Sequence, residues 1–278
     1  MKSTRGDRRP TLRNSPGGAR SSRLLHHIRN TVQKEASAPP ALNGGVERRV
    51  EHFGVSHGGF PEALFGSDFD PGGFEKRCGR YGSMGFWDIE TLGLGDVPIF
   101  LVGLLTYEYQ PLSPGPDFRL DMVLARDPSA EAVMTREVAA RLARCNTWVT
   151  FNGRSFDYPR LSKRAFRHQI DFPGCVRHLD LLVLVRRRWK GELPDCRLGT
   201  VERRLLGLDR SATDVPGREV PERYRDYVAT GERRWIEPVL EHNRLDISAM
   251  VVLLDRLVGM DPEFVQAGEK QHTQKLSR

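Results

Sequence analysis

The sequence lacks any apolar run long enough to cross a membrane. Its most apolar stretch extends only from Ile99 to Leu105, whereas a membrane-spanning helix needs about 20 such residues. No apolar segment follows the basic start of the chain, so we expect no secretory signal. The four cysteines are widely separated and include no C-x-x-C pair, which disfavours a zinc site, an iron–sulfur cluster or a disulfide framework. We therefore expect a cytoplasmic protein with reduced thiols and no membrane association.

Acidic residues are scarce at the N-terminus. Residues 1–34 carry nine basic side chains and one acidic side chain, a net charge of +8, whereas the whole chain carries +7. The remainder of the chain is therefore close to neutral. This composition is compatible with a tail that holds phosphates without sequence preference, with a solvated disordered leader, and with an organelle transit peptide.

A regular hydrophobic pattern is also missing from the first quarter of the chain. Residues 1–75 are rich in Arg, Ser, Gly and Pro, which predicts a mostly disordered region with some order from Val46 onward. We expect one folded domain over residues 76–262 and a disordered tail over residues 263–278.

The expected domain begins with strands and continues with strands and helices in alternation. Strands are predicted over residues 84–90, 98–109, 118–125, 147–151 and 176–180. Helices are predicted over residues 128–144, 156–168, 181–190, 198–206, 221–229 and 236–258, with Pro238 close to a helix start. The first three strands are joined by short loops and should form an antiparallel meander, in which Gly103 would be a weak point or a bulge. The fold class is therefore α/β, with a mixed sheet of a three-strand meander and two parallel strands flanked by helices.

Two carboxylates stand at alternate positions in the first predicted strand. Asp88 and Glu90 should project from one face of the sheet, with Ile89 buried on the other face. Adjacent like charges are costly without a cation, and Mg²⁺ prefers oxygen ligands. The alternative is a pair of solvated acids at a strand end, so a metal site requires further carboxylates.

Two further acids lie where they could join Asp88 and Glu90 in a metal site. Asp157 follows a short strand and a glycine turn at the start of a helix, where a simple helix cap is the alternative. Asp246 precedes an apolar helical stretch, and His242 lies four residues earlier, on the same helical face. Phosphodiester hydrolysis by two divalent ions uses carboxylates of this kind to hold the ions and a base to accept a proton.

Three segments carry a family resemblance. The segments are DIET at 88–91, FNGRSFDYPRL at 151–161 and HNRLD at 242–246. They resemble the three motifs of the DnaQ-like, or DEDD, exonucleases, which have the ribonuclease-H-like fold, and the chain is most similar to the YprB-like family of predicted exonucleases. The resemblance covers about residues 80–260, including the stretch from His178 to Tyr224. It implies a 3′–5′ exonuclease that hydrolyses single-stranded DNA or RNA with two Mg²⁺ or Mn²⁺ ions.

The resemblance also assigns roles to residues. Asp88, Glu90, Asp157 and Asp246 would be metal ligands, and His242 would be the general base. The sequence departs from the family at this last position, because His-type members place the histidine five residues before the final Asp and Tyr-type members place a tyrosine four before it. Here a histidine has the Tyr-type spacing.

The substrate surface is predicted from basic and aromatic residues. Arg160, Lys163, Arg164 and Arg167 follow Asp157 on one helix and would contact phosphates, although a solvated charged face is the alternative. Asp180 would be an auxiliary acid or would order a turn. Trp189 would stack on a base or lie in the core.

Two other functions use the same features. One is a non-catalytic nucleic-acid-binding module, and the other is a structure-specific endonuclease. The four clustered carboxylates disfavour the binding module, because their negative charge would oppose nucleic-acid binding.

Overall fold

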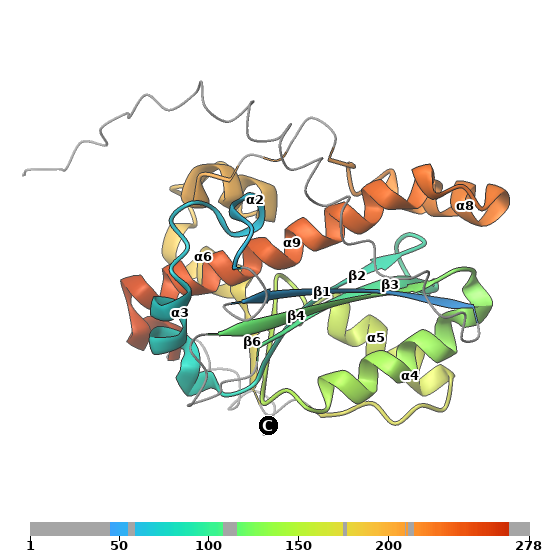
Figure 1. The fold of residues 1–278 in the computed structure, drawn as a ribbon, viewed down its shortest axis with the longest axis horizontal. Helices are drawn as coiled ribbons and strands as arrows, with labels where there is room; N and C mark the ends of the chain where they lie inside the picture. Colours follow the sequence, from blue (N-terminus) through green and yellow to red (C-terminus); the bar gives the residue numbers. More distant parts are fainter. Residues whose placement is uncertain are drawn as a thin grey trace, which may run out of the picture. The chain divides into compact units, whose positions relative to one another are not determined.

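A mixed sheet of six strands organises the described part of the chain. The computed structural model describes residues 45–54, 59–107, 116–174, 177–208, 210 and 214–266 (Figure 1). Its strands are β1 (Val46–Gly54), β2 (Met84–Thr91), β3 (Ile99–Tyr107), β4 (Asp117–Ala125), β5 (Thr147–Thr150) and β6 (Arg177–Asp180). They lie in the order β1-β4-β3-β2-β5-β6.

The strand pairing follows from the chain connections. β2, β3 and β4 are joined in succession and pair antiparallel, whereas β5 and β6 follow helices and run parallel to β2. Because both faces of β3 are covered, its sequence is almost continuously apolar. The predicted meander and the two predicted parallel strands are confirmed.

The sheet contains one strand that the sequence did not reveal. β1 pairs antiparallel with β4 along its whole length, from Val46 opposite Ala125 to Gly54 opposite Asp117. We expected residues 1–75 to be mostly disordered, yet β1, α2 (Glu62–Phe65) and α3 (Pro71–Cys78) contribute buried aromatic side chains to the core. β1 lacks the apolar alternation of a half-buried strand because Glu47, Arg49 and Glu51 pair with charged residues of α9 (Arg233–Met260), as Arg49 does with Glu237 at 2.7 Å.

The C-terminal boundary also differs from the expectation. Residues 262–266 are helical and Val265 is fully buried, although we expected the domain to end at residue 262. Residues 1–44 and 267–278, including the basic N-terminal segment, lie outside the described residues.

Helices cover both faces of the sheet. The remaining helices are α4 (Glu131–Leu142), α5 (Asp157–Arg167), α6 (Leu181–Trp189), α7 (Leu198–Val201), the π-helix η5 (Glu202–Leu206) and α8 (Val220–Thr230), with short 3₁₀ turns η3 (Gly79–Tyr81) and η4 (Pro128–Ala130). One core lies between the sheet and α9, and a second core lies between the opposite face and helices α4 and α5 (Figure 1). Within the described residues, no helix is both long enough and apolar enough to span a membrane.

Helix α9 lies directly against the centre of the sheet. It starts at Arg233, before the predicted start at residue 236, and continues through Pro238 near its N-terminal end. Gly103 pairs regularly with both neighbouring strands and forms no bulge. A methyl group at Gly103 would overlap Asn243 Oδ1 and Ile247 Cδ1 of α9. The absence of a side chain at this glycine therefore allows α9 to approach β3 closely.

Candidate active site

The first two carboxylates project from β2 toward α9. Phe86 belongs to the core under α9, whereas Trp87 and Ile89 belong to the core on the other face. Because side chains alternate along a strand, Asp88 and Glu90 share the face of Phe86. Asn243 on α9 donates from Nδ2 to Asp88 Oδ2 at 2.9 Å, so the close approach at Gly103 brings β2 and α9 into direct polar contact.

The third carboxylate reaches β2 from the start of α5. β2 pairs with β5 only from Met84 to Phe86. Beyond that point, Ile89 N–H donates to Asp157 Oδ1 at 3.3 Å, and Asp157 is only 3% exposed. The Asp157 carboxylate is therefore held beside the backbone between Asp88 and Glu90.

Asp180 orders the turn that leads to Asp157. Its two carboxylate oxygens accept from Asn152 N at 2.8 Å and from Arg154 N at 3.1 Å, and it also caps α6 through Leu182 N at 3.1 Å. This geometry corresponds to the turn-ordering alternative rather than to an auxiliary acid in the site.

The fourth carboxylate and the histidine lie one turn apart on α9. His242 Nε2 lies 3.8 Å from Asp246 Oδ2, as the i,i+4 spacing predicts. Asn243, between them in sequence, reaches Asp88. One helix therefore presents three polar side chains to the carboxylates of β2.

Burial and mutual repulsion raise the pKa values of the clustered acids. Burial, followed by the charges of Asp157, Glu90 and Asp246, raises the pKa of Asp88 well above its usual range. Burial also raises the pKa of Glu90 to about 8 and that of Asp157 to about 7. Burial and the neighbouring negative charges therefore shift all three acids toward their protonated forms relative to acids in water.

The donor set fits a hard divalent cation in its chemistry. Carboxylate oxygens are the ligands that Mg²⁺ and Mn²⁺ prefer, and a bound cation would relieve the repulsion that raises these pKa values. In the described part of the chain, no three His, Cys, Asp or Glu side chains are already arranged around a single metal position. The case for a divalent cation therefore rests on the residue types of the acids and on their clustering.

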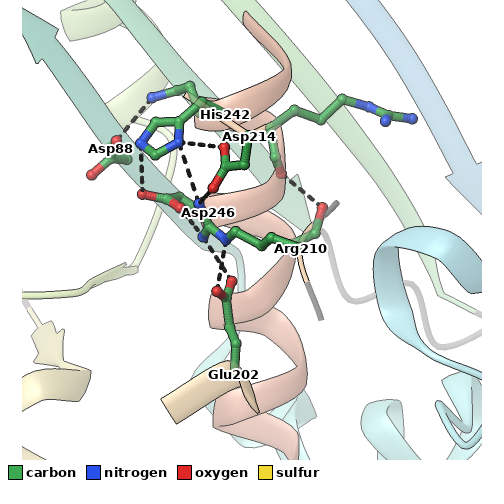
Figure 2. Close-up of polar contacts among 9 residues, drawn as sticks. Asp88, Glu202, Arg210, Asp214, His242 and Asp246 are labelled. Carbon is green, nitrogen blue, oxygen red and sulfur yellow. Dashed lines mark hydrogen bonds and ion pairs between the residues drawn. The ribbon is translucent and has the colours of Figure 1, made fainter. Parts of the chain in front are cut away.

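An arginine that the sequence analysis missed joins this cluster. Arg210 contacts Glu202 through Nε and Nη2, both at 2.7 Å, and Asp214 through Nη1 at 3.0 Å (Figure 2). Its Nη2 also pairs with Asp246 Oδ1. Glu202 is 3% exposed and Arg210 15% exposed, so this is a largely buried set of ion pairs.

The histidine is part of the same set. Asp214 Oδ1 lies 2.8 Å from His242 Nδ1. Burial alone would lower the pKa of His242, but the hydrogen bond with Asp214 and the charges of Asp246 and Glu90 outweigh it and raise the pKa to about 9. No local sequence pattern predicts these contacts, because Glu202, Asp214 and His242 come from separate segments.

The predicted basic residues on α5 occupy different environments. Arg164 is buried and pairs with Glu131 through Nε at 2.7 Å. Lys163 and Arg167 are exposed and pair with Asp96 at 3.1 and 3.4 Å. Arg160 stacks over the Phe156 ring, 3.5 Å from its centroid. Outside this helix, Trp189 is buried in the core under α9.

Comparisons with known proteins place the chain in a family. A family model described as the RNase H superfamily matches residues 85–258. Over 174 residues the chain is 30% identical to the uncharacterized protein YprB of Bacillus subtilis (strain 168), with 60% of this chain and 40% of YprB covered. The chain therefore spans less than half the length of this relative.

The fold is also similar to a solved structure. The family B DNA polymerase from the hyperthermophilic archaeon Pyrobaculum calidifontis matches with a TM-score of 0.50 and 17% identity, covering 63% of this chain and 24% of the polymerase. At this identity the similarity concerns the fold alone. The family model covers more than half of the chain, from β2 to α9, and the chain therefore belongs to the RNase H superfamily.

Proposed function

We propose that the protein is a metal-dependent 3′–5′ exonuclease that hydrolyses phosphodiester bonds of single-stranded nucleic acid. The observation that carries this proposal is the gathering of four carboxylates from β2, α5 and α9, of which Asp88, Glu90 and Asp157 have raised pKa values. Clustered acids are costly for a fold unless they hold cations. A purely binding module would gain nothing from this cost.

The residues have distinct roles in this proposal. Asp88, Glu90, Asp157 and Asp246 would hold two Mg²⁺ or Mn²⁺ ions, which when bound would stabilise charge on the attacking and leaving oxygens. His242 would accept the proton of the attacking water at Nε2. Since the negative charge around His242 raises its pKa, neutralisation of these acids by cations would favour the neutral imidazole that a base requires.

The substrate class rests on other features. The similar archaeal protein is by its title a DNA polymerase, which acts on a nucleic acid. Arg160, next to Asp157 on α5, and the exposed Lys163 and Arg167 would contact phosphates. Arg164 instead joins α5 to Glu131, so we assign it a structural part in this surface. The 3′–5′ direction and the single-stranded substrate rest on the resemblance of the three motifs to DEDD exonucleases.

The test is an assay with 5′-labelled oligonucleotides of matched DNA and RNA sequence in Mg²⁺ or Mn²⁺. We expect a ladder of successively shortened products, no activity in excess EDTA, and loss of activity in Asp88→Asn with the fold retained, because an amide is a poorer ligand for a hard dication. Arg77→Gln, which changes an ion pair between α3 and α9 away from the site, is the matched control and should retain activity.

The same assay distinguishes the other functions. A single internal cut in a structured substrate would indicate a structure-specific endonuclease, and binding without any product would indicate a non-catalytic module. Activity that persists in EDTA would contradict the metal mechanism.

A further inference from the structure

Arg210 is held by contacts on two sides. On one side its Nε and Nη2 form a two-point pair with Glu202, the first residue of the π-helix η5. On the other side its Nη2 pairs with Asp246 and its Nη1 with Asp214 at 3.0 Å. The guanidinium fork fixes its partners in direction as well as in distance. Glu202 therefore anchors Arg210, and Arg210 in turn fixes two further carboxylates.

Asp214 extends the set to His242. Two groups lie against His242 Nδ1: Asp214 Oδ1 at 2.8 Å and Arg210 Nη1 at 3.3 Å. An ionised carboxylate can only accept and a guanidinium can only donate. Because the carboxylate contact is the shorter one, we place the ring proton of a neutral imidazole on Nδ1. The other nitrogen, Nε2, then lacks a proton and lies on the side of Asp246. Figure 2 shows the imidazole between Asp214 and Asp246.

We infer that Glu202, Arg210 and Asp214 form a positioning relay that holds Asp246 in its ligand orientation and keeps His242 in the tautomer that can accept a proton at Nε2. This inference rests on the proposed function, in which Asp246 is a metal ligand and His242 the base. Outer partners of this kind orient a metal ligand and fix the tautomer of a histidine. None of the three residues needs to touch the substrate.

The geometry favours positioning over blockage of the site by Arg210. Both contacts with Glu202 draw the guanidinium toward η5, and Arg210 bonds to only one oxygen of Asp246. The other oxygen, Oδ2, faces His242. A blocking arginine would instead occupy the space among the acids and would compete with a metal ion.

The first experiment measures metal binding by calorimetric titration of the full chain with Mn²⁺. For Arg210→Gln we expect the Kd for Mn²⁺ to rise about 10–100-fold, the usual effect of losing an outer partner of a ligand. Arg210→Lys should show a smaller rise, because one ammonium group cannot reproduce the two-point contact with Glu202. Arg77→Gln, which breaks a similar two-point pair between Arg77 and Asp255 on α9, should leave the Kd unchanged.

Two results of this titration would overturn the role of Arg210. Tighter Mn²⁺ binding in Arg210→Gln would mean that the arginine competes with the metal, and an unchanged Kd in the folded variant would mean that it does not orient Asp246. If Arg210→Gln does not fold, Glu202→Gln provides the same measurement, because it weakens the anchor of Arg210 while preserving the shape of the side chain. A raised Kd supports the relay, and an unchanged Kd contradicts it.

The second experiment tests Asp214 through the tautomer of His242. In Asp214→Asn one of the two oxygens becomes an amide N–H donor. Arg210 can only donate, so the new amide nitrogen should face His242 Nδ1 and drive the ring proton to Nε2. Nitrogen-15 NMR of the Mg²⁺-loaded chain, at an alkaline pH where the imidazole is neutral, should record this change from the Nδ1–H to the Nε2–H form.

The kinetic consequence is specific to a positioning residue. Turnover of Asp214→Asn at saturating substrate should fall by roughly 10²-fold, within the usual worth of a general base, while its Kd for Mn²⁺ remains that of the unaltered chain. An unchanged tautomer would overturn the role of Asp214. If the unaltered chain hydrolyses no oligonucleotide, the proposed function fails, whereas the titration and the NMR spectrum still test the relay.

Discussion

At the scale of single residues, the acids of the site make the metal-free protein sensitive to pH. In the folded state the pKa of Glu90 is about 8 against an ordinary 4.5, and that of Asp157 is about 7 against 3.8. At a pH between the ordinary pKa of each acid and its raised pKa, the folded state therefore binds more protons than the unfolded state. The resulting stabilisation is complete below about pH 4 and is lost as pH rises toward about 8.

We therefore predict that the free energy of unfolding in EDTA falls from pH 5 to pH 8, by an amount on the order of a few kcal/mol. Added Mg²⁺ should stabilise the protein most at the upper end of this range, where the ligands are ionised. Urea unfolding at each pH measures both effects, and Glu90→Gln should show a weaker dependence on pH. A constant or rising stability in EDTA would contradict the prediction.

His242 provides a second prediction at this scale. His242→Ala should lower turnover by roughly 10²–10⁴-fold at saturating metal, because it removes the proposed base. His242→Tyr should retain substantially more activity than His242→Ala, since the position has the spacing of the Tyr-type subclass. Turnover of both variants across pH measures this difference. Near-normal turnover in His242→Ala would assign the residue to packing alone.

The individual residues also show how much of the site could be predicted from the sequence. The period of two placed Asp88 and Glu90 on one face, and the i,i+4 spacing placed His242 and Asp246 together. The role of Arg210 could not be predicted, because Asp214 is its only local carboxylate partner among those described above, whereas Glu202 and Asp246 lie 8 and 36 residues away in sequence. Such contacts depend on the path of the loop before α8, which no local pattern determines.

At the scale of elements, the contact between β3 and α9 decides whether the two halves of the site meet. Asp88 on β2 lies opposite Gly103 on β3, and α9 lies against that glycine. A strand glycine suggests a weak point from sequence alone, whereas its role here is to make room for a helix. The fold class was predictable from the order of strands and helices, but this contact was not.

We predict that Gly103→Ala moves α9 away from the sheet. The added methyl group would overlap Asn243 and Ile247, and overpacking of this kind costs about 1–3 kcal/mol of stability. Metal affinity should fall as well, because Asp246 moves with the helix. Urea unfolding and Mn²⁺ titration measure the two effects. Gly217→Ala, where no atom lies within 4 Å of the added group, should change neither, and equal behaviour of both variants would exclude the proposed contact.

At the scale of the whole molecule, β1 connects the start of the described chain to its last long helix. β1 pairs with β4 over its full length. Two of its acidic side chains form ion pairs with arginines of α9: Glu51 with Arg244 at 3.0 Å and Glu47 with Arg233 at 2.8 Å. In the sequence, the charged residues Glu47, Arg49 and Glu51 suggest a solvated segment, because their partners on α9 lie 186 to 193 residues away.

Two truncations test this arrangement. A chain that begins at residue 45 should retain cooperative unfolding, because it keeps β1. Its nucleic-acid affinity should depend less steeply on salt, because it lacks the +8 charge of residues 1–34. A chain that begins at residue 76 should be strongly destabilised, since it loses an edge strand and the aromatic side chains of α2 and α3. Equal stability of both chains in urea would show that β1 is dispensable, and an equal salt slope to that of the full chain would show that the basic segment does not contact phosphate.

The position of the final long helix has a consequence for biosynthesis. During translation the sheet and α5 leave the ribosome before α9, because α9 is the last long helix in the chain. Until α9 has emerged, Asp88 and Glu90 face no helix, and the apolar side of the sheet that α9 covers remains open to chaperones. The nascent chain therefore carries an incomplete carboxylate cluster while it is still close to ribosomal and messenger RNA. The hydrolysis proposed above would therefore have to wait until Asp246, in the middle of α9, has left the ribosome.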